Sequence, residues 1–340
     1  MGDILKDIAG KHTKELKELK TMASAIGSDF CAAPGNMGCV SCKVDDTHML
    51  IKRMAAKLSS CDGTRNLNVV NYARLSDWFM TSDPLTLTEG VEATANVELL
   101  ASTIDGRGTS ALVGAHSLLD KYCLHSYDAF VNIACASEQG IGIITRCFLD
   151  AAYEWLWLPF NRQPAKVAFM LKEAQRQHQE RREAEPQVFF LQNNGVLITG
   201  NSAKEILSIH EDIHQRLAKR FKGERSDLVH ADFKAWKDAP FTSTKSNYQA
   251  LAGDENWLTF HSENPTFASD ERLKELLDKY PKGLKINKRK KVLEYVDIPK
   301  TEACELDELI SYSVFIDDKF NNSKLRRLTY QDAAPDFVGR

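Results

Sequence analysis

Hydrophobic and polar positions form their clearest pattern between residues 188 and 217. Two short apolar runs, VFFLQ and VLITG, flank an Asn-Gly pair at Asn194-Gly195, and such a pair favours a β-hairpin because both turn positions take positive φ. Ser202 precedes Glu205 by three residues, a capping box that predicts the start of a helix. The apolar stripe of this helix follows the 3.6-residue period at Ile206, Ile209, Ile213 and Leu217. The pattern therefore predicts a hairpin followed by an amphipathic helix.

The same patterns predict helices and strands along the rest of the chain. Helices are expected at residues 4–26, 75–80, 110–122, 164–182, 269–280 and 304–320. Strands are expected in the hairpin runs CVSCKVDD and HMLIK and in the pair LKIN and KVLEYV. The segment CLHSYDAFVNIACAS is expected to be a strand that runs into a helix, and GIGIITRCFLDAAYEWLWLPF a helix followed by a short strand. The periodicity of the remaining stretch up to residue 103 is weak, and residues 223–247 are expected to form an irregular connection.

Composition and charge narrow the possible partners. The chain has 340 residues, 43% of them hydrophobic, and a formal net charge of −3. This balance gives no general affinity for nucleic acid or for an anionic membrane, and the basic run at residues 288–291 falls where a β-turn is expected. The N-terminal segment contains no apolar core of signal-peptide length. No later run approaches the roughly 18 apolar residues of a membrane span. We therefore expect a cytoplasmic protein without a nucleic-acid partner.

The eight cysteines are expected to be free thiols, because a chain without a secretion signal rarely builds a disulfide framework. Cys39 and Cys42 form a C-x-x-C motif, which occurs in structural zinc sites and in redox pairs. A structural zinc site needs a second such pair, and the sequence contains none. The motif is therefore interpreted as two buried or incidental thiols, with a metal-binding or redox role as the alternative.

The sharpest motif is His210-Glu211-Asp212-Ile213-His214, which matches the H-E-x-x-H of zinc hydrolases. That spacing places two imidazoles one helical turn apart to bind the metal, and the glutamate then acts as general base. The glycine and third histidine of metzincins are missing here, since Leu217 and Arg220 follow instead. The two histidines are therefore expected on the half-exposed flank of the helix.

Four segments, taken in order, resemble the class II aldolase and adducin family over residues 14–220. They are CKVDDTHMLIK, YCLHSYDAFVNIACA, EWLWLPFNRQP and FFLQNNGVLITGNSAKEI. The resemblance implies a three-layer α/β/α domain with a central, mostly antiparallel sheet at residues 1–220. Residues 221–340 then form a C-terminal α+β extension that completes the domain or a subunit interface. Active members of the family are metal-dependent aldolases or epimerases of sugar phosphates, commonly assembled as cyclic tetramers.

The resemblance also identifies positions where the family carries its chemistry. The three metal-binding histidines of the family correspond here to His125, Tyr127 and Asn194, so one imidazole remains. Three imidazoles are the usual way to hold such a metal with positions open for substrate, and an amide or phenol is a poor replacement. Ala111-Leu112 stand where the family has its catalytic glutamate. A rebuilt metal site that combines His125 with His116 or Asp128 stays open as an alternative.

The phosphate-binding loop of the family aligns in two registers. One uses Gly35-Asn36 with a small insertion, and the other uses Gly38 to Ser41 in register with Lys43. Lys52 fits the family pattern, although Met54-Ala55 replace the Ser-Gly pair expected after it. The candidate substrate residues are therefore Asn36, Ser41, Lys43 and Lys52.

Three functional hypotheses follow. The first is a pseudoenzyme that has lost most metal ligands and the catalytic glutamate, binds no cofactor, and serves as a binding, scaffold or regulatory protein. The second is an active lyase or epimerase of a sugar phosphate, with zinc or another divalent metal in a remodelled site. The third is a zinc hydrolase that uses His210, Glu211 and His214. The resemblance implies a homo-oligomer, such as a tetramer, and the first hypothesis adds a protein partner.

Overall fold

A computed structural model describes residues 2–61, 65–87, 90–106, 108–181, 183–228, 241–242, 257–258, 268–290 and 292–328. In this part of the chain, eight strands form one sheet in the order β4-β3-β2-β1-β5-β8-β7-β6. Every neighbouring pair is antiparallel except β6 and β7, so the prediction of a mostly antiparallel sheet is confirmed. The strands are β1 (Cys39–Lys43), β2 (His48–Lys52), β3 (Leu67–Asn71), β4 (Thr103–Asp105), β5 (Tyr122–Ser126), β6 (Trp155–Leu158), β7 (Val188–Leu191) and β8 (Val196–Gly200).

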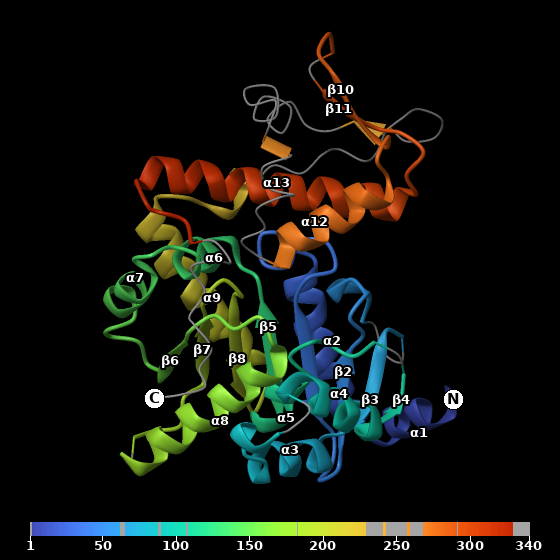
Figure 1. The fold of residues 1–340 in the computed structure, drawn as a ribbon, viewed down its shortest axis with the longest axis vertical. Coiled ribbons are helices and arrows are strands. Elements are labelled where there is room, and N and C mark those ends of the chain that lie inside the picture. Colours follow the sequence, from blue (N-terminus) through green and yellow to red (C-terminus); the bar gives the residue numbers. More distant parts are fainter. Residues whose placement is uncertain are drawn as a thin grey trace.

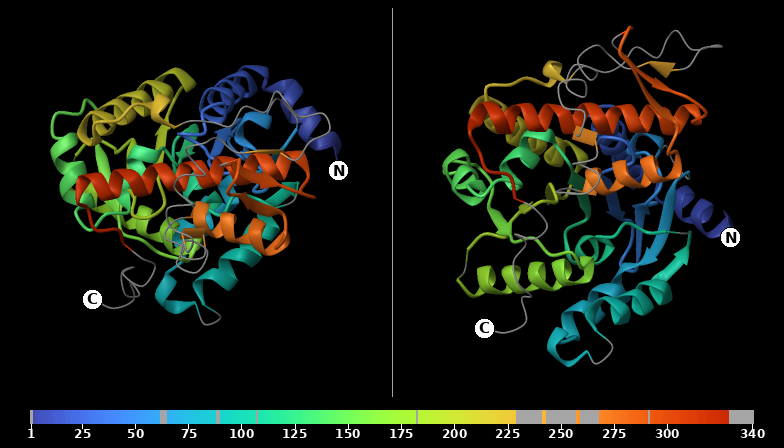
Figure 2. Two further views of the ribbon diagram at one scale, coloured as in Figure 1. Left: turned by 90° about the horizontal axis from the view of Figure 1, so that it is seen from above. Right: turned by 45° about the horizontal axis from the view of Figure 1, so that its top comes forward.

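Helices cover both faces of this sheet. One face carries α2 (Thr13–Gly27), α6 (Ala129–Cys135) and α9 (Ala203–Phe221), and the other carries α3 (Tyr72–Thr81), α5 (Val113–Leu118) and α8 (Pro164–Glu180). Seen from above, α9 and α2 lie on the opposite side of the molecule from α3 and α8 (Figure 2). The expected three-layer α/β/α arrangement is confirmed. The remaining α-helices are α1 (Gly2–Lys11), α4 (Val91–Ser102), α7 (Gly140–Cys147), α12 (Ala268–Lys279) and α13 (Lys300–Ser323), and the 3-10 turns are η1 (Leu58–Ser60), η2 (Pro84–Thr86) and η3 (Arg225–Asp227).

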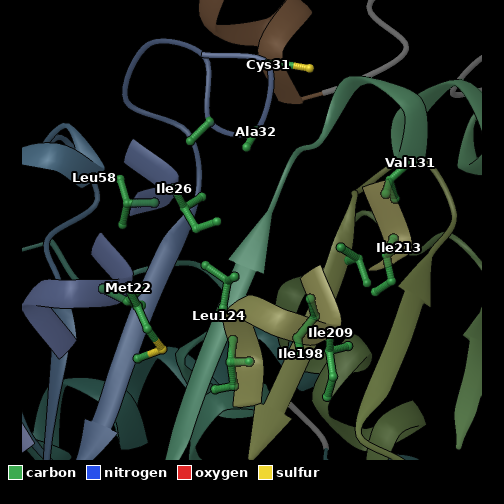
Figure 3. Close-up of a cluster of buried hydrophobic side chains, with 14 of the residues drawn as sticks. Met22, Ile26, Cys31, Ala32, Leu58, Leu124, Val131, Ile198, Ile209 and Ile213 are labelled. Atoms are coloured by element: carbon green, nitrogen blue, oxygen red, sulfur yellow. The ribbon is translucent and has the colours of Figure 1, made fainter. Parts of the chain in front are cut away.

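The period of two along each strand sorts side chains between the two helical layers. In β1, Val40 and Cys42 face the layer of α2, α6 and α9, whereas Cys39 packs with α3, α5 and α8. Figure 3 shows part of the first cluster, in which Leu124 of β5 and Ile198 of β8 meet Ile209 of α9. Strands that are buried on both faces consist almost entirely of apolar residues, which explains the continuous runs VFFL and VLIT.

The C-terminal helix α13 belongs to the same core. Four apolar side chains, Tyr312, Phe315, Ile316 and Phe320, pack in the buried cluster shared with α2, α6 and α9. The N-terminal half of α13 packs in a smaller cluster with α12 and the second sheet, whose strand order is β10-β11-β9. Figure 1 shows α13 crossing one end of the main sheet, with α12 beside it. The strands of the second sheet are β9 (Phe241–Thr242), β10 (Leu284–Asn287) and β11 (Val292–Tyr295).

Most predicted elements are confirmed, and several details differ. The long N-terminal helix is divided at His12, and β3, β4 and α4 were not predicted. In the β7–β8 turn, positive φ falls on Asn193 and Gly195, so the connection is longer than the two-residue turn expected from Asn194-Gly195. Most of the expected irregular connection at residues 223–247 lies outside the described residues. Among the described helices, none combines the length and apolar character needed to cross a membrane.

Candidate functional site

A cavity of about 600 Å³ opens at the end of the sheet where β5 finishes. Its walls come from the loop before β1, the end of β2, the turn between β7 and β8, and helix α12. Polar side chains make up a large part of this lining, and both His125 and Tyr127 reach it because alternate residues of an extended segment point to the same face. The other polar lining residues are Asn36, Lys52, Ser110, Asn161, Arg162, Asn193, Asn194, Glu271, Arg272 and Glu275.

His125, Tyr127 and Asn194 come together in this cavity and bond to one another. The Nε2 of His125 lies 2.7 Å from the backbone oxygen of Asn194, and the Tyr127 hydroxyl donates to the Asn194 side-chain oxygen at 2.7 Å. A carbonyl only accepts hydrogen bonds, so the proton of His125 resides on Nε2. The rings of His125 and Tyr127 also pack with centroids 4.6 Å apart. The three positions therefore form one closed hydrogen-bonded group.

Burial holds this group in its neutral state. It lowers the pKa of His125 to about 4, and it raises the pKa of the Tyr127 phenol above its usual range. A divalent metal would need deprotonated or lone-pair donors at these positions. The phenol keeps its proton, the side-chain oxygen of Asn194 already accepts a hydrogen bond, and one nitrogen of His125 is used as a donor. The residues at the three ligand positions therefore do not fit the metal of the class II aldolases.

Lys52 and Asn36 lie in the cavity wall, where the ammonium group of Lys52 is used to hold backbone. Its Nζ donates to the backbone oxygens of Asn36 at 3.0 Å, Arg53 at 3.1 Å, Met54 at 3.3 Å and Ala56 at 2.6 Å. Burial lowers the pKa of Lys52, while the four carbonyl oxygens satisfy the charged form. The ammonium group thus joins the loop before β1 to the loop after β2.

Ser41 and Lys43, the other two phosphate-loop candidates, lie away from this cavity. The Ser41 hydroxyl is 2.7 Å from Nδ1 of His116, which is itself completely buried. Lys43 is at the opposite end of β1, donates to the backbone oxygen of Leu119, and lies 4.6 Å from the centre of the Tyr72 ring. The structure therefore brings Asn36 and Lys52 to the cavity with His125, and leaves Ser41 and Lys43 outside it.

Helix α13 supplies a carboxylate to the loop that was aligned with the phosphate-binding segment. The backbone N–H of Gly35 donates to Oε2 of Glu308 at 2.9 Å, and Lys57 donates to Oε1 of the same carboxylate at 2.6 Å. Gly35 has a φ of +59°, and a Cβ there would meet the Cγ of Glu305 at 2.9 Å. The sequence pattern gave no sign of this contact, because 273 residues separate Gly35 from Glu308 and the family resemblance ends before α13.

Comparisons with known proteins identify the fold. No family model matches the sequence, and no curated protein matches it. A solved N-terminal class II aldolase domain of a conserved protein from Thermoplasma acidophilum matches with a TM-score of 0.50 at 16% identity, over 61% of this chain and 93% of that one. A sugar-phosphate aldolase from Thermotoga maritima matches with a TM-score of 0.44 at 10% identity, over 62% of this chain and 94% of that one. The fold is that of a class II aldolase.

Ala111 and Leu112 occupy the cavity wall of this class II aldolase fold at the position expected for a catalytic carboxylate. Neither side chain transfers a proton. The alternative ligands His116 and Asp128 do not complete a metal site with His125: His116 bonds to Ser41, and Asp128 bonds to His214 behind the sheet. Among the described residues that line the cavity, His125 is the imidazole, and the carboxylates are Glu271 and Glu275 of α12.

The H-E-x-x-H residues of α9 also behave differently from the sequence expectation. His210 and His214 were expected on a half-exposed flank, and this is wrong: they are 2% and 5% exposed. His210 Nε2 lies 2.8 Å from Ser126 Oγ, whereas Glu211 points outward and pairs with Arg225 at 2.8 Å. Buried polar partners on β5 and α6 make the inward histidines tolerable. The glutamate does not share a site with the two imidazoles.

Cys39 and Cys42 lie on opposite faces of the class II aldolase sheet, because they are three positions apart on one strand. Both are buried free thiols, as expected, and burial raises the pKa of each. Their opposite orientations prevent a shared metal site or a disulfide between them.

Proposed function

We propose that this chain is a non-catalytic binding protein built on the class II aldolase fold. The observation that carries this proposal is the closed group of His125, Tyr127 and Asn194, in which a phenol and an amide satisfy each other where the family has metal ligands. A phenol that donates its proton to a side-chain oxygen is not a metal ligand, and one imidazole alone holds zinc weakly.

The other catalytic parts are replaced by internal contacts in the same way. The ammonium of Lys52 is surrounded by four backbone oxygens, and the N–H of Gly35 is occupied by the Glu308 carboxylate. Each contact satisfies a polar group that would otherwise require a ligand or water. The chain therefore keeps the fold and the cavity without depending on a substrate to complete its hydrogen bonds.

The cavity itself supports a binding role. Its volume of about 600 Å³ is typical of small-molecule sites, which span roughly 300–1,000 Å³. Asn193 lines it with a side-chain amide for which we find no hydrogen-bond partner among the described residues. The occupant we propose is a small polar molecule that is bound without being cleaved. A homo-oligomer, such as the tetramer of class II aldolases, a protein partner and a cytoplasmic location also remain part of this proposal.

The test is the cleavage of L-fuculose 1-phosphate by the purified chain, with Zn²⁺ or Mn²⁺ added, alongside a His125→Gln variant. We expect no aldol cleavage by either protein and the same metal content in both, because His125 holds no metal. A double substitution, Tyr127→His with Asn194→His, is the matched gain-of-function control and should add about one metal equivalent. Metal-dependent cleavage by the wild type that disappears in His125→Gln would overturn the proposal in favour of an active lyase.

A further inference from the structure

Three buried side chains that can bind metal lie together on the side of β5 facing away from the cavity. They are Cys31 in the loop before β1, Asp128 at the start of α6 and His214 on α9, and one donor atom from each lies within 4.8 Å of the other two. Their exposed fractions are 1%, 0% and 5%. Figure 3 shows Cys31 at the edge of the apolar cluster that also contains Val131 of α6 and Ile213 of α9. The three residues therefore share an enclosed environment.

Backbone hydrogen bonds fix the loop that carries Cys31. Ala129 N donates to the backbone oxygen of Cys31 at 2.8 Å, and Tyr127 N donates to that of Ala32 at 2.9 Å. These bonds attach the loop to the junction of β5 and α6, directly beside Asp128. Alternation along the extended end of β5 sends Tyr127 into the cavity and Asp128 to the other face, where α9 presents His214. The cluster is thus separate from the His125 group.

The charged groups around the cluster are Asp128, Asp29 and Arg225. Burial alone would raise the pKa of Asp128, but the hydrogen bond from His214 Nδ1 at 2.6 Å and nearby positive charges lower it below its usual value. Burial, Asp128 and Asp29 together raise the pKa of the Cys31 thiol. Arg225 is the nearby arginine, and it already pairs with Asp29 at 3.2 Å and with Glu211 at 2.8 Å. A bound cation would stabilise both the carboxylate and a thiolate here.

Two other roles for the cluster, a catalytic one and a purely structural one, leave part of its geometry unexplained. A Cys-His-Asp set also occurs in nucleophilic catalysis, but that chemistry needs an exposed thiol with a lowered pKa, and Cys31 has neither property. A structural pair explains part of the cluster: Asp128 Oδ1 caps α6 by accepting from Phe130 N at 3.0 Å while Oδ2 accepts from His214. That pair gives no reason for a thiol beside the carboxylate.

We propose that Cys31, Asp128 and His214 form a buried zinc site that ties the loop before β1 to α6 and α9. Sulfur, imidazole nitrogen and carboxylate oxygen are the donors zinc prefers, with bond lengths of about 2.0–2.3 Å. A tetrahedral centre spaces its ligand atoms by roughly 3.3–3.8 Å, so the cluster closes around the ion by side-chain shifts of about 1 Å. Zinc replaces the thiol proton of Cys31, which is released to solvent, and it replaces the hydrogen bond between His214 Nδ1 and Asp128 Oδ2, whose proton moves to the other nitrogen of the neutral imidazole. A water molecule takes the fourth position.

The test is titration of the chelator-treated full-length chain with Co²⁺, which reports a thiolate ligand through near-ultraviolet charge-transfer absorption. We expect about one equivalent to bind with that absorption, and Zn²⁺ to displace it. Cys31→Ser, which changes one side-chain atom, and His214→Gln should each lose the absorption. The matched controls Cys39→Ser and His125→Gln should retain it. Circular dichroism establishes that each variant is folded.

A second measurement keeps the test independent of the proposed function. Zinc should raise the unfolding temperature of the wild type in a concentration-dependent way and leave Cys31→Ser unchanged, because a ligand that binds only the native state stabilises it. Absence of a bound equivalent in the wild type, or binding that persists in folded Cys31→Ser, would overturn the zinc site. Binding lost only in His125→Gln would overturn both this site and the non-catalytic assignment of the cavity.

Discussion

Consecutive residues at the end of β5 serve two different environments. His125 and Tyr127 point into the cavity, whereas Ser126 and Asp128 point toward α9 and bond to His210 and His214. A slip of one residue in this strand would exchange the two sets. The register of β5 against β1 and β8 therefore determines both the cavity chemistry and the buried polar cluster behind the sheet.

At the scale of single residues, the completely buried His116 should make the free energy of unfolding depend on pH. Burial lowers its pKa to about 3 from the ordinary value of 6.5, so the imidazole is neutral in the folded protein at pH 4.5. Between about pH 6.5 and 3, His116 binds a proton in the unfolded chain but not in the folded chain, so acid favours unfolding. The contribution of His116 to the free energy of unfolding is therefore fully present above pH 6.5 and decreases as the pH falls toward 3. Between pH 7 and 4.5 the loss from this residue is roughly 3 kcal/mol.

Urea unfolding at pH 7 and pH 4.5 measures this loss for the wild type and for His116→Asn, which keeps an acceptor near Ser41. We expect the variant to be less stable at pH 7 but to lose about 3 kcal/mol less between the two pH values. An equal loss in the two proteins would show that His116 already carries its charge in the fold.

Sequence patterns located some site residues and missed others for physical reasons. His125, Tyr127 and Asn194 could be brought together because the resemblance to the class II aldolase family aligns them with one site, while hairpin and strand signals placed only the segments that carry them. Cys31 could not, since a lone cysteine in a loop has no spacing motif and its partners are about 100 and 180 positions away along the chain. The inward histidines of α9 were misjudged because hydrophobic periodicity takes no account of buried polar partners.

At the scale of elements, local signals succeeded where several agree. The β7–β8 hairpin and α9 have apolar runs, turn residues and a cap, and the Ser202 hydroxyl accepts from Glu205 N as expected. The second half of the capping box differs, because the Glu205 carboxylate accepts from Asn201 N. Helix α4 escaped prediction because its apolar residues, among them the exposed Val97 and Leu100, do not form a single stripe.

The β7–β8 turn depends on glycine at position 195. Gly195 has a φ of +74°, and a Cβ there would lie 2.2 Å from the backbone oxygen of Ser126. Gly195→Ala should therefore destabilise the fold by about 2–4 kcal/mol, measured by chemical unfolding, since neither the backbone conformation nor the space suits a side chain. It should also disturb the neighbouring Asn194 contacts.

Gly142 in α7 is the matched control, because a Cβ there meets nothing closer than Arg146 Nη2 at 3.9 Å. Gly142→Ala should be neutral or stabilising by up to about 1 kcal/mol, as alanine favours a helix over glycine. Equal effects of the two substitutions would contradict the role assigned to the turn.

At the scale of the whole molecule, α12 and α13 contribute to the class II aldolase core and its cavity. Glu271, Arg272 and Glu275 of α12 line the cavity, and the Tyr312 hydroxyl of α13 donates to the backbone oxygen of Tyr127. A proposed boundary at residue 220 therefore separates segments that share a hydrophobic cluster. The family resemblance gave no information about this region, since it ends near that residue.

Removing α13 tests whether the rest of the fold depends on it. A chain that ends at Pro299 lacks α13, which uncovers α6 and removes four buried apolar side chains from the cluster that α6 shares with α9. We expect this truncated chain to lose cooperative thermal unfolding. The full-length Phe320→Ala variant should still unfold cooperatively, with a free energy of unfolding lower by about 3–5 kcal/mol. Asp318→Ala, at an exposed position of the same helix, should stay within about 0.5 kcal/mol of the wild type. A cooperative transition in the truncated chain would establish residues 1–299 as self-sufficient.

The position of α13 has a consequence for synthesis on the ribosome. The helices that it covers are complete by Phe221, yet Phe320 follows 99 residues later in the sequence. At roughly 5–20 residues per second, the nascent chain waits about 5–20 s before its core can close. During that interval, the apolar surface of α6 that α13 later covers faces water. We therefore expect the yield of folded protein to depend on translation speed and on chaperones that shield this surface.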